Sequence, residues 1–185
     1  MWFTTPMQRK TLIALHLVIS SFFMPFLLLM PITGSLYLLN EKGSVEREVA
    51  FHIDDSNIPK NNEERVTYFK DEFKNRGIDF DFEYIKTRGN NLTFRPSSRD
   101  HYLAKLNDSG AEVILLKPDF LLKTIELHKG HGPLMFKKLE TIFGVGLVLM
   151  AISGIWLAFQ SKELRTKMGL SFLVGFLLFS LSLIL

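Results

Sequence analysis

The chain alternates between long apolar runs and one polar segment. Three runs carry almost no charge, and they cover residues 11–39, 139–159 and 168–185. The first two exceed the ~20 residues that a helix needs to cross a bilayer, and the third is close to the lower limit of about 17. We therefore predict an α-helical membrane protein with three transmembrane helices.

The polar segment between the first two runs has the pattern of a small α+β domain. Apolar residues recur at helical spacing over 61–76, which predicts a helix that ends at Gly77. Strand-type stretches separated by turn signals follow, at 80–86, 92–95, 101–106 and 111–116. Pro118 then opens a short second helix that runs to His128. We expect one helix packed on an antiparallel meander, with 43–53 as an edge strand.

The distribution of charge predicts the orientation in the membrane. The chain has 185 residues and a net charge of +3, but segment 41–130 holds 17 of the 19 acidic residues and 15 of the 22 basic ones. The positive excess therefore flanks the apolar runs and does not indicate a nucleic-acid-binding face. By the positive-inside rule, the basic clusters before the first span and after the second lie in the cytoplasm. These clusters consist of Arg9, Lys10, Lys162, Arg165 and Lys167.

This orientation gives the expected organisation in a bacterial inner membrane. Residues 1–39 form a cytoplasmic N-terminus and the first span, 40–130 a periplasmic domain, 131–160 the second span, 161–167 a cytoplasmic loop and 168–185 the third span. The C-terminus is then periplasmic. The first apolar run is far longer than the core of about 7–15 residues in a signal peptide, so we expect an uncleaved anchor. The chain has no cysteine, which excludes disulfides and thiolate-held iron–sulfur clusters.

Histidines give the candidate chemistry. His16 lies inside the first apolar run, and His128 and His131 lie just before the second. Histidine is rare at membrane depth, because a polar ring in lipid must be satisfied or used. Two histidines at the ends of apolar helices are also what a b-type haem requires as axial ligands. The alternative is structural: His16 would bond a neighbouring carbonyl or Ser20, and interfacial water would solvate His131.

Three short motifs mark the first two spans. They are Arg9-Lys10…Leu15-His16…Pro31-Ile32-Thr33-Gly34 in the first span, Leu127-His128-Lys129-Gly130 before the second and Ile152-Ser153-Gly154-Ile155-Trp156-Leu157 at its end. Their order and spacing, with an α+β segment the length of one PepSY module, resemble the PepSY-associated transmembrane family over most of the chain. Members of that family are inner-membrane proteins linked to iron and siderophore use, and some are haem-containing reductases of ferric chelates. The resemblance implies a PepSY-like periplasmic domain, haem b as cofactor, and His16 and His128 as haem-associated histidines.

The positions of these histidines predict two haem sites in a homodimer. His16 follows Lys10 by six residues and so lies about 9 Å into the membrane. His128 and His131 lie near the outer face of a core ~30 Å thick, so one haem cannot bind both groups. The i, i+3 spacing of His128 and His131 puts these two rings on one side of one helix, where they cannot bind opposite faces of a porphyrin. We expect His16 of each chain to bind an inner haem, and His128 or His131 of each chain to bind an outer haem.

These inferences predict electron transfer, with no acid–base or nucleophilic residues. The resemblance implies a haem-dependent ferric reductase that passes electrons from an undetermined donor to ferric iron or a ferric chelate in the periplasm. One alternative is a membrane-anchored PepSY module that binds or regulates a partner protein. Another is an accessory subunit of a larger transporter or respiratory complex. His52 and His101 lie in the polar segment, and we expect both at its surface.

Overall fold

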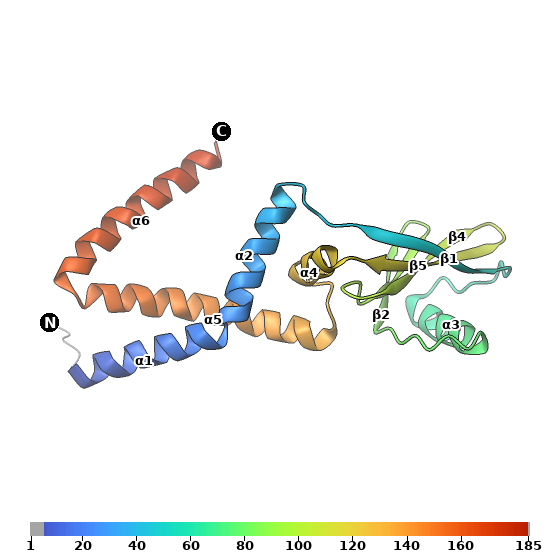
Figure 1. Cartoon of the computed structure of the whole chain (residues 1–185), viewed down its shortest axis with the longest axis horizontal. Coiled ribbons are helices and arrows are strands. Elements are labelled where there is room, and N and C mark those ends of the chain that lie inside the picture. Colours follow the sequence, from blue (N-terminus) through green and yellow to red (C-terminus); the bar gives the residue numbers. More distant parts are fainter. Residues whose placement is uncertain (1–5, 185) are drawn as a thin grey trace. The chain divides into compact units, whose positions relative to one another are not determined.

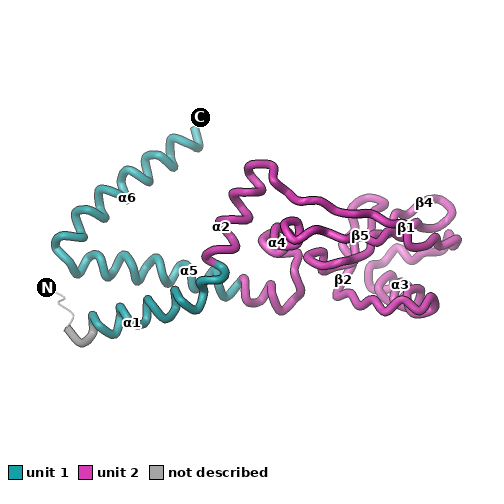
Figure 2. The backbone as a smooth tube through the Cα atoms, in the orientation of Figure 1, with its two compact units in different colours: residues 1–26, 141–185 teal, residues 27–140 magenta. Residues whose placement is uncertain are grey.

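The computed structural model describes residues 6–184, with side chains from Arg9 onward, as six helices and five strands (Figure 1). The helices are α1 (Pro6–Phe22), α2 (Met24–Leu38), α3 (Asn62–Asn75), α4 (Phe120–His128), α5 (Leu134–Phe159) and α6 (Lys162–Ser182). The strands are β1 (Val45–Ile53), β2 (Tyr84–Arg88), β3 (Asn91–Arg95), β4 (His101–Asn107) and β5 (Gly110–Pro118). The chain divides into two compact units, residues 1–26 with 141–185, and residues 27–140 (Figure 2).

The apolar helices confirm the predicted spans in part. Among the described residues, α5 and α6 are each long and apolar enough to cross a membrane. A third span results only if Arg9–Phe22 and Met24–Leu38 are counted together as one span, broken at Phe23. Pro25 explains the break, because proline lacks the amide hydrogen of a regular helix and its ring clashes with the carbonyl four residues earlier. The structure therefore has two or three long apolar helices.

The third apolar helix begins earlier than predicted. Ser161 is its N-cap and accepts a hydrogen bond from the Leu164 amide, so α6 starts at Lys162. Glu163 and Lys167 then form an i, i+4 ion pair of 2.7 Å on its first turns. The prediction of a loop over 161–167 is therefore wrong for the residues from Lys162 onward. Charge alone suggested a loop there, although charged residues are good helix formers.

The described residues of the first unit form helices joined by short turns, and aromatic rings fill the contact between its helices. The ring of Phe143 on α5 lies 5.6 Å from that of Phe23 and 5.2 Å from that of Phe26, between centroids. A Cβ at Gly146 would overlap the Phe23 ring. Glycine at this position therefore lets the ring lie directly against the backbone of α5, as expected for small residues in membrane helices.

The second unit holds a five-stranded antiparallel sheet in the order β1-β5-β4-β3-β2. The strands β2 to β5 form the predicted meander, and β1 pairs with β5 as the predicted edge strand. The predicted helix is α3, which begins after the N-cap Asn61. It packs Phe69 and Phe73 against Leu92 and Phe94 of β3, and all four side chains are at most 1% exposed. The α+β arrangement of the polar segment is confirmed.

Aromatic residues before β2 account for one wrong strand prediction. The alternation of Phe80, Phe82 and Tyr84 predicted a strand over 80–86, but β2 begins only at Tyr84. Phe80 and Phe82 instead insert their rings beside Phe73, at centroid distances of 5.2 and 6.3 Å. The periodicity therefore reflects two rings that enter the core from an irregular segment, and not the pleat of a strand.

Phe73 lies at the centre of this aromatic cluster, and its truncation tests the packing. Phe73→Ala should lower the free energy of unfolding of this domain by about 3–5 kcal/mol, because it leaves a cavity among close-packed rings. The measurement is a urea titration of the full-length protein in detergent, followed by near-ultraviolet circular dichroism. Phe120→Ala is the matched control, because Phe120 is 82% exposed. Equal losses in the two variants would contradict this account of the core.

Candidate functional site

His16 is bonded to a hydroxyl of another helix. Its Nδ1 lies 2.7 Å from Oγ of Ser153 on α5, within the first unit. The Ser153 hydroxyl in turn lies 3.0 Å from the carbonyl oxygen of Met150, to which it donates. Ser20, the partner expected from the sequence, instead donates to the backbone carbonyl of His16 at 2.7 Å. The ring is therefore held across two helices and not within its own helix.

An apolar cavity of about 310 Å³ adjoins this pair in the first unit. Its lining comes from α1 and α5 and consists of Leu12, Leu15, Ile19, Leu149, Ile152, Ser153 and Trp156. Ser153, the partner of His16, contributes its hydroxyl to a wall that is otherwise made of large apolar side chains. Such a wall suits an apolar ligand with few polar groups.

His128 is held in a similar way in the second unit. It is the last residue of α4, and its Nδ1 lies 3.1 Å from Oγ1 of Thr33 on α2. Thr33 is only 3% exposed, and its hydroxyl donates to the carbonyl oxygen of Leu29 at 2.6 Å. A Cβ at Gly34 would lie 3.2 Å from Cε1 of His128, closer than ordinary contact. The absence of a side chain at Gly34 therefore makes room for the ring.

A second cavity, of about 390 Å³, lies against His128 itself. Its lining comes from α2 and from the end of α4, and consists of Thr33, Gly34, Tyr37, Leu38, Ile125, His128 and Lys129. Apart from Lys129, no residue of this lining carries a permanent charge. The cavity therefore places an imidazole and one cation beside a mainly apolar space.

His131 lies in a different setting from His128. The helix α4 ends at His128, and Gly130 follows with a left-handed φ of 69°. His131 is therefore beyond the helix, and the expectation that it shares a helix face with His128 is wrong. Its Nδ1 donates to Oε2 of Glu126 at 2.7 Å. The local signal was the glycine at 130, which is a common helix stop.

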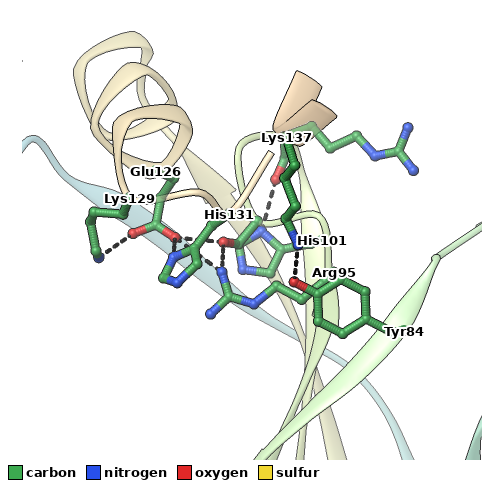
Figure 3. Close-up of polar contacts among 9 residues, drawn as sticks. Tyr84, Arg95, His101, Glu126, Lys129, His131 and Lys137 are labelled. Atoms are coloured by element: carbon green, nitrogen blue, oxygen red, sulfur yellow. Dashed lines mark hydrogen bonds and ion pairs between the residues drawn. The ribbon is translucent and has the colours of Figure 1, made fainter. Parts of the chain in front are cut away.

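Glu126 is the centre of a buried polar network (Figure 3). Its carboxylate accepts from Lys129 at 2.6 Å, from Ser97 at 2.5 Å and from Arg95 at 3.2 Å, in addition to His131. The side chains of Arg95 and Glu126 are only 11% and 12% exposed. Burial raises the pKa of Glu126, but hydrogen bonds from Lys129, Ser97 and His131 outweigh it and lower the pKa to about 2. Glu126 is thus fully ionised at neutral pH.

Two further contacts tie the start of α5 to the sheet within the second unit. The carboxylate of Glu83, just before β2, accepts from the amide of Leu134 at 2.9 Å and so caps α5. Lys137 donates to the hydroxyl of Tyr84 on β2 (Figure 3). The first turn of α5 therefore has a fixed place beside the sheet edge.

The remaining histidines of the polar segment differ in exposure. His52 is exposed, as expected, whereas His101 is only 6% exposed, so the surface prediction for His101 is wrong. Nδ1 of His101 donates to the carbonyl oxygen of Arg99 at 2.8 Å. Burial lowers the pKa of His101, and the ring is therefore neutral at neutral pH. This hydrogen bond gives the buried ring of His101 a polar partner.

Comparisons with protein-family models, with curated proteins and with solved structures find no match to this chain. The similarity to the PepSY-associated transmembrane family therefore rests on the short motifs alone and stays a prediction. Within the described residues, no group of three His, Cys, Asp or Glu side chains could hold a metal ion.

The sequence identified the histidines but assigned no role to their partners. Thr33 and Ser153 stand inside two of the quoted motifs, each directly before a glycine. This repeated pair of a hydroxyl residue and a glycine was the sequence signal that pointed to Thr33 and Ser153 as partners of the histidines. Glu126 had no comparable signal, because Arg95 and Ser97 are distant in the sequence and are brought to it only by the fold.

Replacing the carboxylate of the buried network should destabilise the domain. Glu126→Gln leaves Arg95 buried without its counter-charge, and we expect a loss of about 3 kcal/mol at neutral pH. The measurement is the same urea titration of the full-length protein. Glu46→Gln, at an exposed position on β1, is the matched control and should change stability by less than about 0.5 kcal/mol.

The same pair of proteins gives a pH test. The pKa of Glu126 lies below its ordinary value of 4.5, so its stabilising contribution is complete above about pH 4.5 and is lost as the pH falls through about 2. The difference in unfolding free energy between the wild type and Glu126→Gln should shrink over that window. A difference that stays constant down to pH 2 would contradict the network.

Proposed function

We propose that this chain is an inner-membrane b-type haem protein that passes electrons across the membrane to ferric iron or a ferric chelate in the periplasm. One observation carries the proposal: His16 and His128 are each held through Nδ1 by a hydroxyl of a neighbouring helix. Within the described part of the chain, neither ring uses Nε2 in a hydrogen bond. Both imidazoles therefore have a free nitrogen for a metal.

This arrangement fits an axial haem ligand. A histidine that binds iron through one nitrogen commonly donates the hydrogen of the other nitrogen to a fixed acceptor, which sets the orientation of the ring. When bound, a haem with imidazole ligands supplies one-electron transfer. The apolar cavities beside Ser153 and His128 would exclude water from its faces.

The proposal assigns the outer ligand to His128 and a structural role to His131. The hydrogen bond from His131 to Glu126 joins it to a network of buried charges, and its side chain is 31% exposed. His128 instead lines a cavity. Since each site then offers one imidazole per chain, a haem held by two imidazoles would need a second copy of the chain. A two-fold homodimer supplies them, with one site at the level of His16 and another at the level of His128.

Orientation and substrate are the further parts of the proposal. The basic residues before the first span and after the second favour a cytoplasmic N-terminus and a periplasmic domain. The resemblance to the PepSY-associated transmembrane family supports a ferric substrate. The electron would then leave near the outer site, at the junction between the periplasmic domain and the membrane.

Optical spectra of histidine variants test the cofactor. Full-length protein purified from membranes should show the α band of a reduced b-type haem after dithionite. His16→Ala and His128→Ala should each lose about half of this signal, because each removes the ligands of one site. His131→Ala should retain the full signal.

His52→Ala is the control for the spectra, because His52 is exposed. A folded wild-type protein without any such band would exclude the reductase. That result would favour a membrane-anchored binding module or an accessory subunit. A band that survives in the His16→Ala, His128→Ala double variant would show that other residues hold the haem.

Vesicles test the direction of electron transfer. The full-length protein is reconstituted with its periplasmic domain outward, in vesicles that enclose a reductant, and ferric citrate is added outside. We expect external ferrous iron to form, as measured with a ferrous-specific dye, and its rate to fall more than tenfold in His16→Ala. Equal rates for the wild type, His16→Ala and empty vesicles would contradict transmembrane electron transfer.

A further inference from the structure

We propose that Ser153 and Thr33 are positioning residues that fix the tautomers of His16 and His128. Each hydroxyl would keep the hydrogen of its imidazole on Nδ1 and leave Nε2 unprotonated. An unprotonated Nε2 is the form that binds iron directly, so the inference rests on the proposed function and deepens it. It assigns a role to two residues that do not themselves touch the metal.

The hydrogen of the Ser153 hydroxyl is already used. Ser153 donates to the carbonyl oxygen of Met150, one turn earlier in α5, at 3.0 Å. A carbonyl oxygen only accepts, and a serine hydroxyl has a single hydrogen to give. We infer that the contact of 2.7 Å with His16 runs from Nδ1–H to Oγ, because this direction lets Ser153 keep its bond to Met150. In this arrangement His16 carries its hydrogen on Nδ1.

The same reasoning applies to Thr33. Its hydroxyl donates to the carbonyl oxygen of Leu29 at 2.6 Å, with Met30 as a weaker acceptor at 3.3 Å. Oγ1 can therefore only accept from His128, whose Nδ1 lies 3.1 Å away. Two separate helix pairs, one in each compact unit, thus have the same arrangement. In each pair, a histidine contacts a hydroxyl that donates its hydrogen to a carbonyl oxygen of its own helix.

The glycine after each hydroxyl lies beside the same atom of the ring. A Cβ at Gly34 would lie 3.2 Å from Cε1 of His128, and a Cβ at Gly154 would lie 3.7 Å from Cε1 of His16. Cε1 sits between the two ring nitrogens, so a side chain pressing there would turn the ring away from its acceptor. An alanine at Gly34 would require the His128 ring to shift by a few tenths of an ångström, whereas an alanine at Gly154 would fit at ordinary van der Waals distance.

The tautomer is measurable before any haem is added. Nitrogen-15 NMR of full-length protein labelled at histidine, in detergent and at neutral pH, distinguishes hydrogen on Nδ1 from hydrogen on Nε2. His101 is an internal reference, because its Nδ1 faces a carbonyl oxygen at 2.8 Å and must donate. We expect His16 and His128 to give the same pattern as His101. Rings with the hydrogen on Nε2 in the wild type would overturn the inference.

Removing each hydroxyl should change the tautomer of the corresponding histidine, because Nδ1 loses its hydrogen-bond acceptor. Ser153→Ala should move the His16 signal toward the Nε2-protonated form, and Thr33→Val should do the same for His128. The conservative variants Ser153→Thr and Thr33→Ser should restore the Nδ1-protonated form. Ser20→Ala and Thr124→Val are the matched controls, because each removes a hydroxyl that bonds only to a helix carbonyl. Unchanged tautomers in Ser153→Ala and Thr33→Val would overturn the inference.

Haem titration then separates this inference from the proposed function. When a metal-binding histidine loses the hydrogen bond at its other nitrogen, its affinity for the metal falls by roughly 10- to 100-fold. We expect haem affinity to fall by this factor at one of the two sites in each variant. The midpoint potential of the affected site should rise, because its imidazole becomes a weaker donor. A wild type that takes up no haem would overturn the proposed function. A wild type that binds haem as tightly as Ser153→Ala and Thr33→Val, with the same potentials, would overturn only the inference.

Discussion

A polar ring in an apolar helix needs a partner for its hydrogen, and the account of this protein depends on how that need is met. His16 and His128 each place Nδ1 within hydrogen-bond distance of a hydroxyl, and each hydroxyl also bonds to a carbonyl oxygen of its own helix. A hydroxyl partner satisfies one nitrogen of each ring, which lowers the cost of placing imidazole among apolar side chains. In the proposal, the other nitrogen, Nε2, would bind the metal.

The α+β domain positions His128, because this residue ends its helix α4. Glu126 lies on the same helix as His128. Its carboxylate accepts hydrogen bonds from Arg95, the last residue of β3, and from Ser97, two residues later. The Glu83 carboxylate accepts from the first amide of α5 and so holds the start of that helix. The sheet and its aromatic core therefore hold the short helix that presents His128.

Local sequence patterns correctly predicted the helices and strands that short-range interactions determine. The helix after Asn61, the meander and the edge strand β1 all follow from periodicity, caps and turn residues. Errors arose where distant contacts decide the outcome. Phe80 and Phe82 alternate because both rings pack against the aromatic core of the domain. His101 is a different case, because its Nδ1 bonds to the carbonyl oxygen of Arg99, only two residues away. His16 and His128 were found from their rarity in apolar runs, but their hydroxyl partners lie 137 and 95 residues away.

The most direct measurement is the haem content of the folded protein. Full-length chain purified in mild detergent is denatured in alkaline pyridine, and the amount of haem b is compared with the amount of protein. The account predicts one haem b per chain, that is, two per dimer, in a preparation whose α3 and sheet are intact. A folded preparation that contains no tetrapyrrole would contradict the account.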